Sequence, residues 1–111
     1  MTVRFFEWGQ AAGGGGSSPT APADALYGDP EQFSGTVTNV GATITFTTLT
    51  KWVHVINADS QWDLEVSFDG GANYIVIGSG GDLQENLHLA SLLLRGNAAG
   101  TDYEIAAGLT A

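Results

Sequence analysis

Two histidines are the side chains of this sequence best suited to acid–base chemistry near neutral pH. His54 lies in the apolar run KWVHVI, and His88 lies in LHLASLLL. Neither has around it the spacing of a nucleophile–histidine–acid triad or of a metal-ligand motif. Isolated histidines of this kind are more often structural than catalytic, so we expect no catalytic residue.

Carboxylates near turns offer a second kind of chemistry. Asp63 and Glu65 are expected on one strand face, where solvated pairs are far commoner than a poised acid and base. Asp59, Asp63 and Asp69 carry oxygen atoms that suit Ca²⁺, but their spacing does not match the calcium loop D-x-[DN]-x-[DN]-G. We therefore expect no metal and no cofactor, and calcium at these turns is the alternative.

Other reactive groups are missing from the sequence. It has no cysteine, which excludes a disulfide, a thiolate nucleophile and a Cys-ligated metal within this chain. The glycine-rich runs GGGG and SGGD lack the Lys-Ser/Thr pair and the strand-to-helix context of a phosphate-binding loop. These absences predict that the protein is not an enzyme.

The charge balance limits the possible partners. Twelve Asp and Glu residues stand against Arg4, Lys51 and Arg95, which gives a formal net charge of −9. Nucleic acids and anionic membranes attract proteins through several Lys or Arg side chains, so we expect neither as a partner. The first ten residues lack the apolar core of a signal peptide, and LASLLL is too short to span a bilayer. Assembly in a cytoplasm is therefore expected.

The middle and end of the chain have the composition of strands. Val, Ile, Thr and aromatic residues dominate there, and turn signals recur about every 8–12 residues, as in a sandwich or barrel. We predict an all-β fold: an antiparallel, jelly-roll-like β-sandwich of about seven or eight short strands over residues 33–111. The expected strands are residues 36–40, 43–48, 52–57, 64–68, 74–77, 91–95 and 103–107, and residues 83–89 are expected to form either a strand or a helical turn.

Alternation of apolar and polar residues predicts which side chains face the core. The expected inward residues are Ile44, Phe46, Val53, Val55, Leu64, Val66, Phe68, Leu92 and Leu94. Residues 64–77 are expected to form a hairpin whose turn, DGGAN, holds two glycines that can adopt positive φ. Residues 74–77 and 92–94 are apolar on both faces, which suggests a second covered surface and hence self-association.

Residues 1–32 differ in kind from the rest. The run AAGGGGSSPTAPA is flexible first and proline-stiffened later, and it cannot form a core of its own. We predict an extended N-terminal arm that binds a partner through apolar anchors near its two ends. The expected anchors are Phe5, Phe6, Trp8, Leu26 and Tyr27.

The stretch from Lys51 to Gly108 resembles small structural proteins of tailed bacteriophages. Those proteins carry a Val-x-Val-x-Asn strand, an Asp-Leu-x-Val-Ser-Phe-Asp-Gly-Gly hairpin and a Leu-x-Leu-Arg-Gly strand. The matching stretches here are Val53 to Asn57, Asp63 to Gly71 and Leu92 to Gly96. The resemblance covers about half of the chain and leaves the arm outside.

The resemblance implies a decoration or cement protein on the capsid surface of a virion. Its partners would be the major capsid protein or other virion structural subunits, and it would form an oligomer, with a trimer favoured. One alternative is a host-recognition or glycan-binding module of a head or tail fibre, with Trp52, Trp62 or Tyr74 stacking on sugar rings. Core and edge packing is the commoner role of such aromatics. Another alternative is a tail or neck structural protein.

Overall fold

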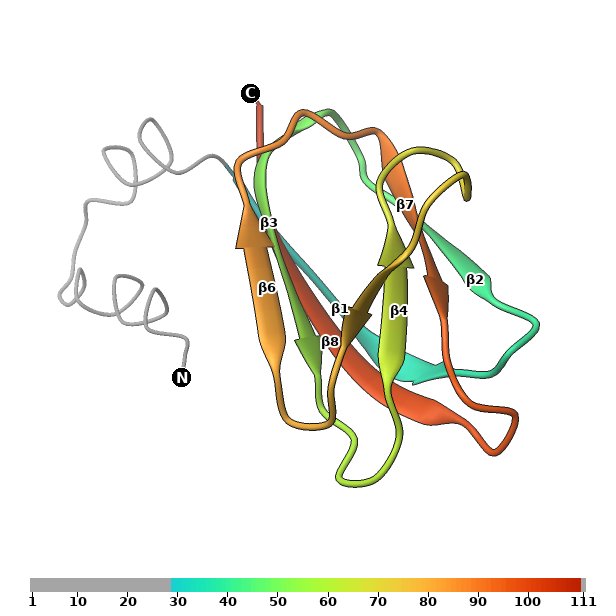
Figure 1. The fold of residues 1–111 in the computed structure, drawn as a ribbon. Helices are drawn as coiled ribbons and strands as arrows, with labels where there is room; N and C mark the ends of the chain where they lie inside the picture. Colours follow the sequence, from blue (N-terminus) through green and yellow to red (C-terminus); the bar gives the residue numbers. More distant parts are fainter. Residues whose placement is uncertain (1–28, 111) are drawn as a thin grey trace, which may run out of the picture.

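The computed structural model describes residues 29–110, which form eight strands in two four-stranded antiparallel sheets (Figure 1). The strands are β1 (Asp29–Val37), β2 (Ala42–Thr45), β3 (Thr50–Asn57), β4 (Leu64–Ser67), β5 (Ile75–Ile77), β6 (Asp82–Glu85), β7 (Ser91–Arg95) and β8 (Thr101–Leu109). Within these residues, no helix has the length and hydropathy needed to cross a membrane.

The strand order is that of a jelly roll. The first sheet has the order β1-β8-β3-β6 and is called sheet A; the second has the order β2-β7-β4-β5 and is called sheet B. Every connection along the chain passes from one sheet to the other except the β4–β5 hairpin, which stays within sheet B. Two interlocked Greek keys of this kind define the jelly roll, so the predicted fold class is confirmed.

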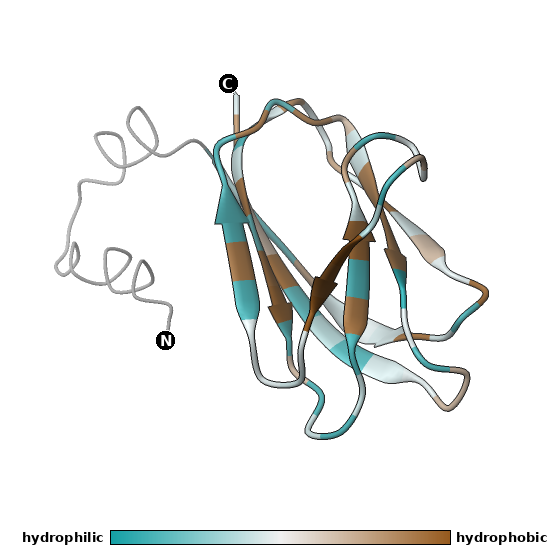
Figure 2. Ribbon diagram, in the orientation of Figure 1, coloured by the Kyte–Doolittle hydropathy of each residue, from teal (hydrophilic) through white to brown (hydrophobic). Residues whose placement is uncertain are grey.

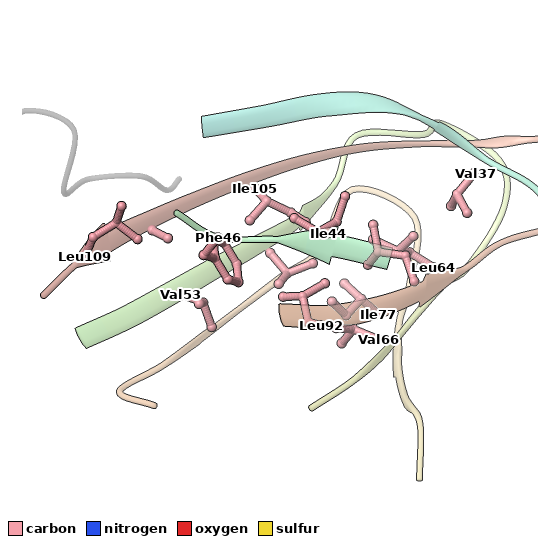
Figure 3. Packing of buried hydrophobic residues seen from close by; sticks show 13 residues of the cluster. Val37, Ile44, Phe46, Val53, Leu64, Val66, Ile77, Leu92, Ile105 and Leu109 are labelled. Carbon is pink, nitrogen blue, oxygen red and sulfur yellow. The ribbon is translucent and has the colours of Figure 1, made fainter. Parts of the chain in front are cut away.

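The two sheets enclose one apolar core (Figure 3). All nine residues predicted to face inward contribute to it, because a period-2 pattern leaves one face of each strand apolar. Eight of them are buried, whereas Phe68 is partly buried and packs against the cluster from its margin. Val37, Ile77, Ile105, Ala107 and Leu109 complete the buried cluster.

The first strand lies further toward the N-terminus than expected. The sequence suggested a strand at residues 36–40, but β1 spans Asp29–Val37 and pairs along its whole length with β8. The expected boundary between residues 32 and 33 therefore falls inside β1. Gly41, at φ +92°, donates its N–H to the carbonyl of Thr38 and closes a turn instead of continuing the strand. Pro30 fits this position because β1 is an edge strand, where prolines are tolerated.

β5 and β7 are apolar on both faces, but their outer apolar residues differ in exposure. β5 is an edge strand and is brown along its length in Figure 2; Ile75 and Val76 there are 44% and 57% exposed. Leu93 points away from the core, yet it is half-buried. A Cβ placed on Gly71 would lie 3.2 Å from Leu93 Cδ1, so the turn of the β4–β5 hairpin covers this side chain.

Candidate functional site

The two histidines lie on different elements. His54 is on β3 and is 2% exposed; its Nε2 atom lies 2.6 Å from Oδ2 of Asp82, on the adjacent strand β6. His88 is exposed in the connection between β6 and β7. The His54–Asp82 pair joins two neighbouring strands, and no sequence motif marks it, because its residues are 28 positions apart.

Asp59 organises the loop after β3. Its Oδ1 accepts hydrogen bonds from the N–H groups of Gln61 and Trp62, at 2.9 and 3.1 Å. Its Oδ2 accepts the N–H of Asp102, on β8, at 3.1 Å. These backbone bonds, led by the one from Asp102, lower the pKa of the Asp59 carboxyl. Both carboxylate oxygens of Asp59 therefore accept backbone hydrogen bonds at the turn that the sequence suggested as a possible calcium site.

Asp69 has the same role in the β4–β5 hairpin. It accepts hydrogen bonds from the side-chain amide and the backbone N–H of Asn73, each at 2.9 Å, and from the Ser67 hydroxyl at 2.8 Å. These bonds, with the Asn73 side chain first, lower the pKa of Asp69 to about 2. Across residues 29–110, no group of three or more His, Asp or Glu side chains is placed to hold a metal ion.

Asp63 and Glu65 do not work as a pair. Asp63 is exposed just before β4, and its backbone carbonyl accepts the Thr101 hydroxyl at 3.2 Å. Glu65 lies on the outer face of β4 and receives the Nε–H of Arg95, on β7, at 2.8 Å. Glu65 is therefore paired with Arg95 and not with Asp63.

The three aromatics proposed as a sugar platform are not brought together. Trp52 is on β3 of sheet A, opposite Gly108 of β8, and is buried at 9% exposure. Trp62 lies in the β3–β4 loop, where its carbonyl accepts an N–H of Asn57 at 2.8 Å. Tyr74 lies just before β5, next to sheet B. Since the outer faces of the two sheets are opposite sides of the sandwich, no single ring platform contains all three.

The predicted arm anchors lie outside the described residues. They are Phe5, Phe6, Trp8, Leu26 and Tyr27, which all precede β1.

Sequence reasoning missed one cluster on the outer face of sheet B. The guanidinium carbon of Arg95 lies 3.6 Å from the centroid of the Tyr74 ring, and its Nη2 lies 2.8 Å from Oε1 of Glu65. Beside it, a cleft of about 470 Å³ is bounded by the turn between β1 and β2. A second cleft of about 470 Å³, on the outer face of sheet A, is lined in part by Ile56 and Glu104.

Comparison with known proteins identifies no family. No protein family and no curated protein matches the chain. A structure of Bacillus endospore appendages, described as disulfide-linked pili, is similar with a TM-score of 0.51 and 15% identity over 74% of this chain and 87% of that chain. A Yersinia pseudotuberculosis-derived mitogen has a TM-score of 0.44 and 13% identity, over 75% and 87% of the two chains.

These similarities concern the fold alone. At 15% identity, the Bacillus structure supports a small β-sandwich and nothing about activity. The present chain has no cysteine, so it cannot form the disulfide links that are described for those pili. A bacteriophage origin is tested by neither structure and stays a prediction.

Proposed function

We propose that this protein is a non-enzymatic structural protein of a tailed-bacteriophage virion, placed on the capsid surface as a decoration or cement protein. Its N-terminal arm, the residues that precede β1, binds the major capsid protein or neighbouring virion subunits. The jelly roll caps that contact from outside. The protein is made and assembled in the host cytoplasm before it joins the particle.

The position of β1 is the observation that supports this proposal most directly. β1 is the edge strand of sheet A into which the N-terminal segment leads. It pairs with β8 over nine residues, from Asp29 opposite Leu109 to Val37 opposite Thr101. A force applied through the arm would be distributed over the hydrogen bonds between β1 and β8, so the sandwich can bear tension without opening its core. An edge strand also leaves the preceding segment a route to a neighbouring subunit.

The aromatic residues of the arm are the source of binding energy in this proposal. Phe5, Phe6 and Trp8 would each remove about 150–250 Å² from water if buried. At about 25 cal/mol per Å², the three rings contribute on the order of 10 kcal/mol before ordering costs. Fixing every residue between these rings and β1 would cost roughly 1–2 kcal/mol per residue in backbone entropy, which exceeds that gain, so the proposal requires that most of the glycine-rich segment stays unfixed on binding. Leu26 and Tyr27, close to β1 in the sequence, would supply a second and smaller anchor.

The roles of the polar residues support a non-enzymatic function. Asp59 and Asp69 hold turns, and Glu65 is paired with Arg95. His54 is 2% exposed and contacts Asp82. Each of these groups has a positioning role that accounts for its chemistry without a reaction.

The arm can be tested on particles that lack the decoration protein. A chain without residues 1–18, and a full chain with Phe5, Phe6 and Trp8 all changed to Ser, should fold but fail to co-sediment with the particles. A full chain with Ser17, Ser18 and Thr20 changed to Ala is the matched control and should bind normally. Binding of the truncated chain as tight as that of the intact one would show that the sandwich surface makes the contact.

Self-association is part of the same proposal. The exposed edge residues Ile75 and Val76 offer apolar surface for contact between copies, and the resemblance to decoration proteins favours a trimer. Light scattering over a concentration series should show a species of about three times the 11.5 kDa chain mass. A monomer at every concentration would rule out a trimer in solution.

A further inference from the structure

A cleft on the outer face of sheet B is a candidate ligand site. Its volume is about 470 Å³, within the range of roughly 300–1,000 Å³ that is usual for small-molecule sites. Its lining includes Asn39, Thr43, Tyr74, Leu93 and Arg95. Asn39 belongs to the turn between β1 and β2, whereas Thr43, Leu93 and Arg95 lie on the outer face of sheet B.

Arg95 is held in place before any ligand arrives. Its Nε and Nη2 atoms both lie 2.8 Å from Oε1 of Glu65, and its guanidinium lies over the Tyr74 ring. The arginine side chain is still 42% exposed. Among residues 29–110, Nη1 donates to no acceptor, so the end of the guanidinium remains available as a two-pronged donor. A fixed side chain loses little entropy on binding, which favours a ligand at this position.

A glycine opens the space beside this arginine. Ala42 pairs with Leu94, so Gly41 stands next to Arg95 at the end of the β2–β7 ladder. Gly41 has φ +92°, and a Cβ there would lie 3.1 Å from the Leu94 carbonyl oxygen and 3.5 Å from Arg95 Cγ. A larger residue would be strained and would narrow the cleft. The hollow therefore depends on glycine at this position.

The charge of the cleft differs from that of the whole protein. The chain has a formal net charge of −9, yet the cleft lining contains one arginine and no acidic residue. The comparable cleft on sheet A is lined in part by Glu104. An anionic group would meet a carboxylate in that second cleft, whereas in this one it would meet a guanidinium that is already ion-paired with Glu65.

We propose that the sheet B cleft binds an acidic sugar, a saccharide that carries a carboxylate on its ring. The paired N–H groups at the end of a guanidinium match a planar carboxylate. The Thr43 hydroxyl and the Asn39 amide supply donors and acceptors for ring hydroxyls. This inference rests on the cleft alone and holds whether or not the protein belongs to a virion.

The test is a titration of the full chain, labelled with ¹⁵N, with galacturonic acid and with galactose as the matched neutral sugar. We expect saturable shifts for Gly41, Thr43 and Arg95 with the acid, and a binding at least about tenfold weaker with galactose, as expected when a charge-assisted hydrogen bond is lost. Acetate and N-acetylalanine test whether a carboxylate alone is enough. The sugar acid should bind more tightly than either.

Three variants separate binding by Arg95 from a purely structural role. Arg95→Gln should weaken binding of the acid at least about tenfold, whereas Thr45→Ala, on the outer face of the same sheet but not lining the cleft, should leave it unchanged. Glu65→Gln breaks the ion pair but keeps the guanidinium, so it should retain binding. If Arg95 served only to pair with Glu65, the Arg95→Gln and Glu65→Gln chains would behave alike.

Each remaining outcome overturns the proposal. Equal binding of galacturonic acid and galactose would show that the arginine does not recognise the carboxylate. Equal binding of acetate or N-acetylalanine would make the cleft a general carboxylate or peptide site. We expect the sugar acid to bind with a Kd of about 1 mM or below, so an absence of shifts at about 20 mM sugar acid would show that the cleft is not a sugar site.

Discussion

At the tip of the β4–β5 hairpin, the carboxylate of Asp69 accepts hydrogen bonds from both the backbone N–H and the side-chain amide of Asn73, each at 2.9 Å. The Ser67 hydroxyl donates to the same carboxylate at 2.8 Å and accepts the N–H of Gly71 at 2.8 Å. The turn is thus built around one ionised carboxylate. Glycines at φ +76° and +95° allow the chain to wrap around it.

This arrangement predicts an acid-sensitive hairpin. The pKa of Asp69 is about 2 in the folded chain and 3.8 at its ordinary value, so its hydrogen bonds stabilise the fold above about pH 4. That contribution is lost as the pH falls from about 4 through 2. Urea unfolding at pH 5, 4, 3 and 2 should show stability falling with pH, and the fall should be smaller in Asp69→Asn and in Asn73→Ala. Identical pH slopes in all three chains would contradict this role.

The loss of unfolding free energy on substitution should increase with the burial of the side chain that is replaced. Leu94 is 0% exposed, so Leu94→Ala should lower the unfolding free energy by about 2–5 kcal/mol. Phe68 is only partly buried, so Phe68→Ala should cost less, about 1–3 kcal/mol. Val76 is 57% exposed, and Val76→Thr should change stability by less than about 0.5 kcal/mol. Chemical denaturation measures all three, and a larger loss at residue 68 than at residue 94 would contradict the observed packing.

Asn57 should be hard to replace. It is 0% exposed; its side-chain amide donates to the carbonyls of Trp62 and Ile77 at 2.8 and 2.9 Å, and its Oδ1 accepts the N–H of Asp59. Asn57→Asp keeps the shape but sets a carboxylate oxygen against two carbonyl oxygens. We expect a loss of about 2–4 kcal/mol, because buried polar groups are left unpaired. Thermal melting at pH 7 would measure it, and a melting temperature equal to that of the parent chain would refute it.

Two glycines form a matched pair for a steric test. A Cβ at Gly96 would lie 2.5 Å from the Val37 carbonyl oxygen and 2.6 Å from Thr101 Oγ1, whereas nothing lies within 4 Å of a Cβ at Gly78. Gly96→Ala should therefore cost about 1–3 kcal/mol or more, since the backbone around it must shift. Gly78→Ala should fold with stability close to that of the parent. Similar stabilities of the two variants would show that the Val37 carbonyl and the Thr101 hydroxyl do not lie so close to Gly96.

Chelation should leave the fold unchanged. The carboxylate oxygens of Asp59 and Asp69 already accept N–H and O–H groups, so they have little capacity left for Ca²⁺. Melting curves with excess EDTA and with added Ca²⁺ should coincide. A melting temperature that falls with EDTA and recovers with Ca²⁺ would restore the calcium alternative at these turns.

The sequence by itself determined the class of the fold. Alternation of apolar and polar residues predicted the inward side chains of β3, β4 and β7. The strand β7 also begins and ends at the residues expected from the sequence. The Asp-Gly-Gly turn predicted the β4–β5 hairpin, whose two strands are close in sequence. These features are local: a side chain's face follows from its parity along the strand, and a turn follows from its own residues.

The tertiary structure decided the strand order and each side-chain cluster. β1 has few apolar residues to mark it, and it forms because β8 supplies a partner from the far end of the chain. Glu65 and Arg95 are 30 positions apart, and Thr36 and Asp102, which share a hydrogen bond, are 66 apart. Such pairs depend on which strands become neighbours, and that choice is made by burial of the whole core, which no short stretch of sequence encodes.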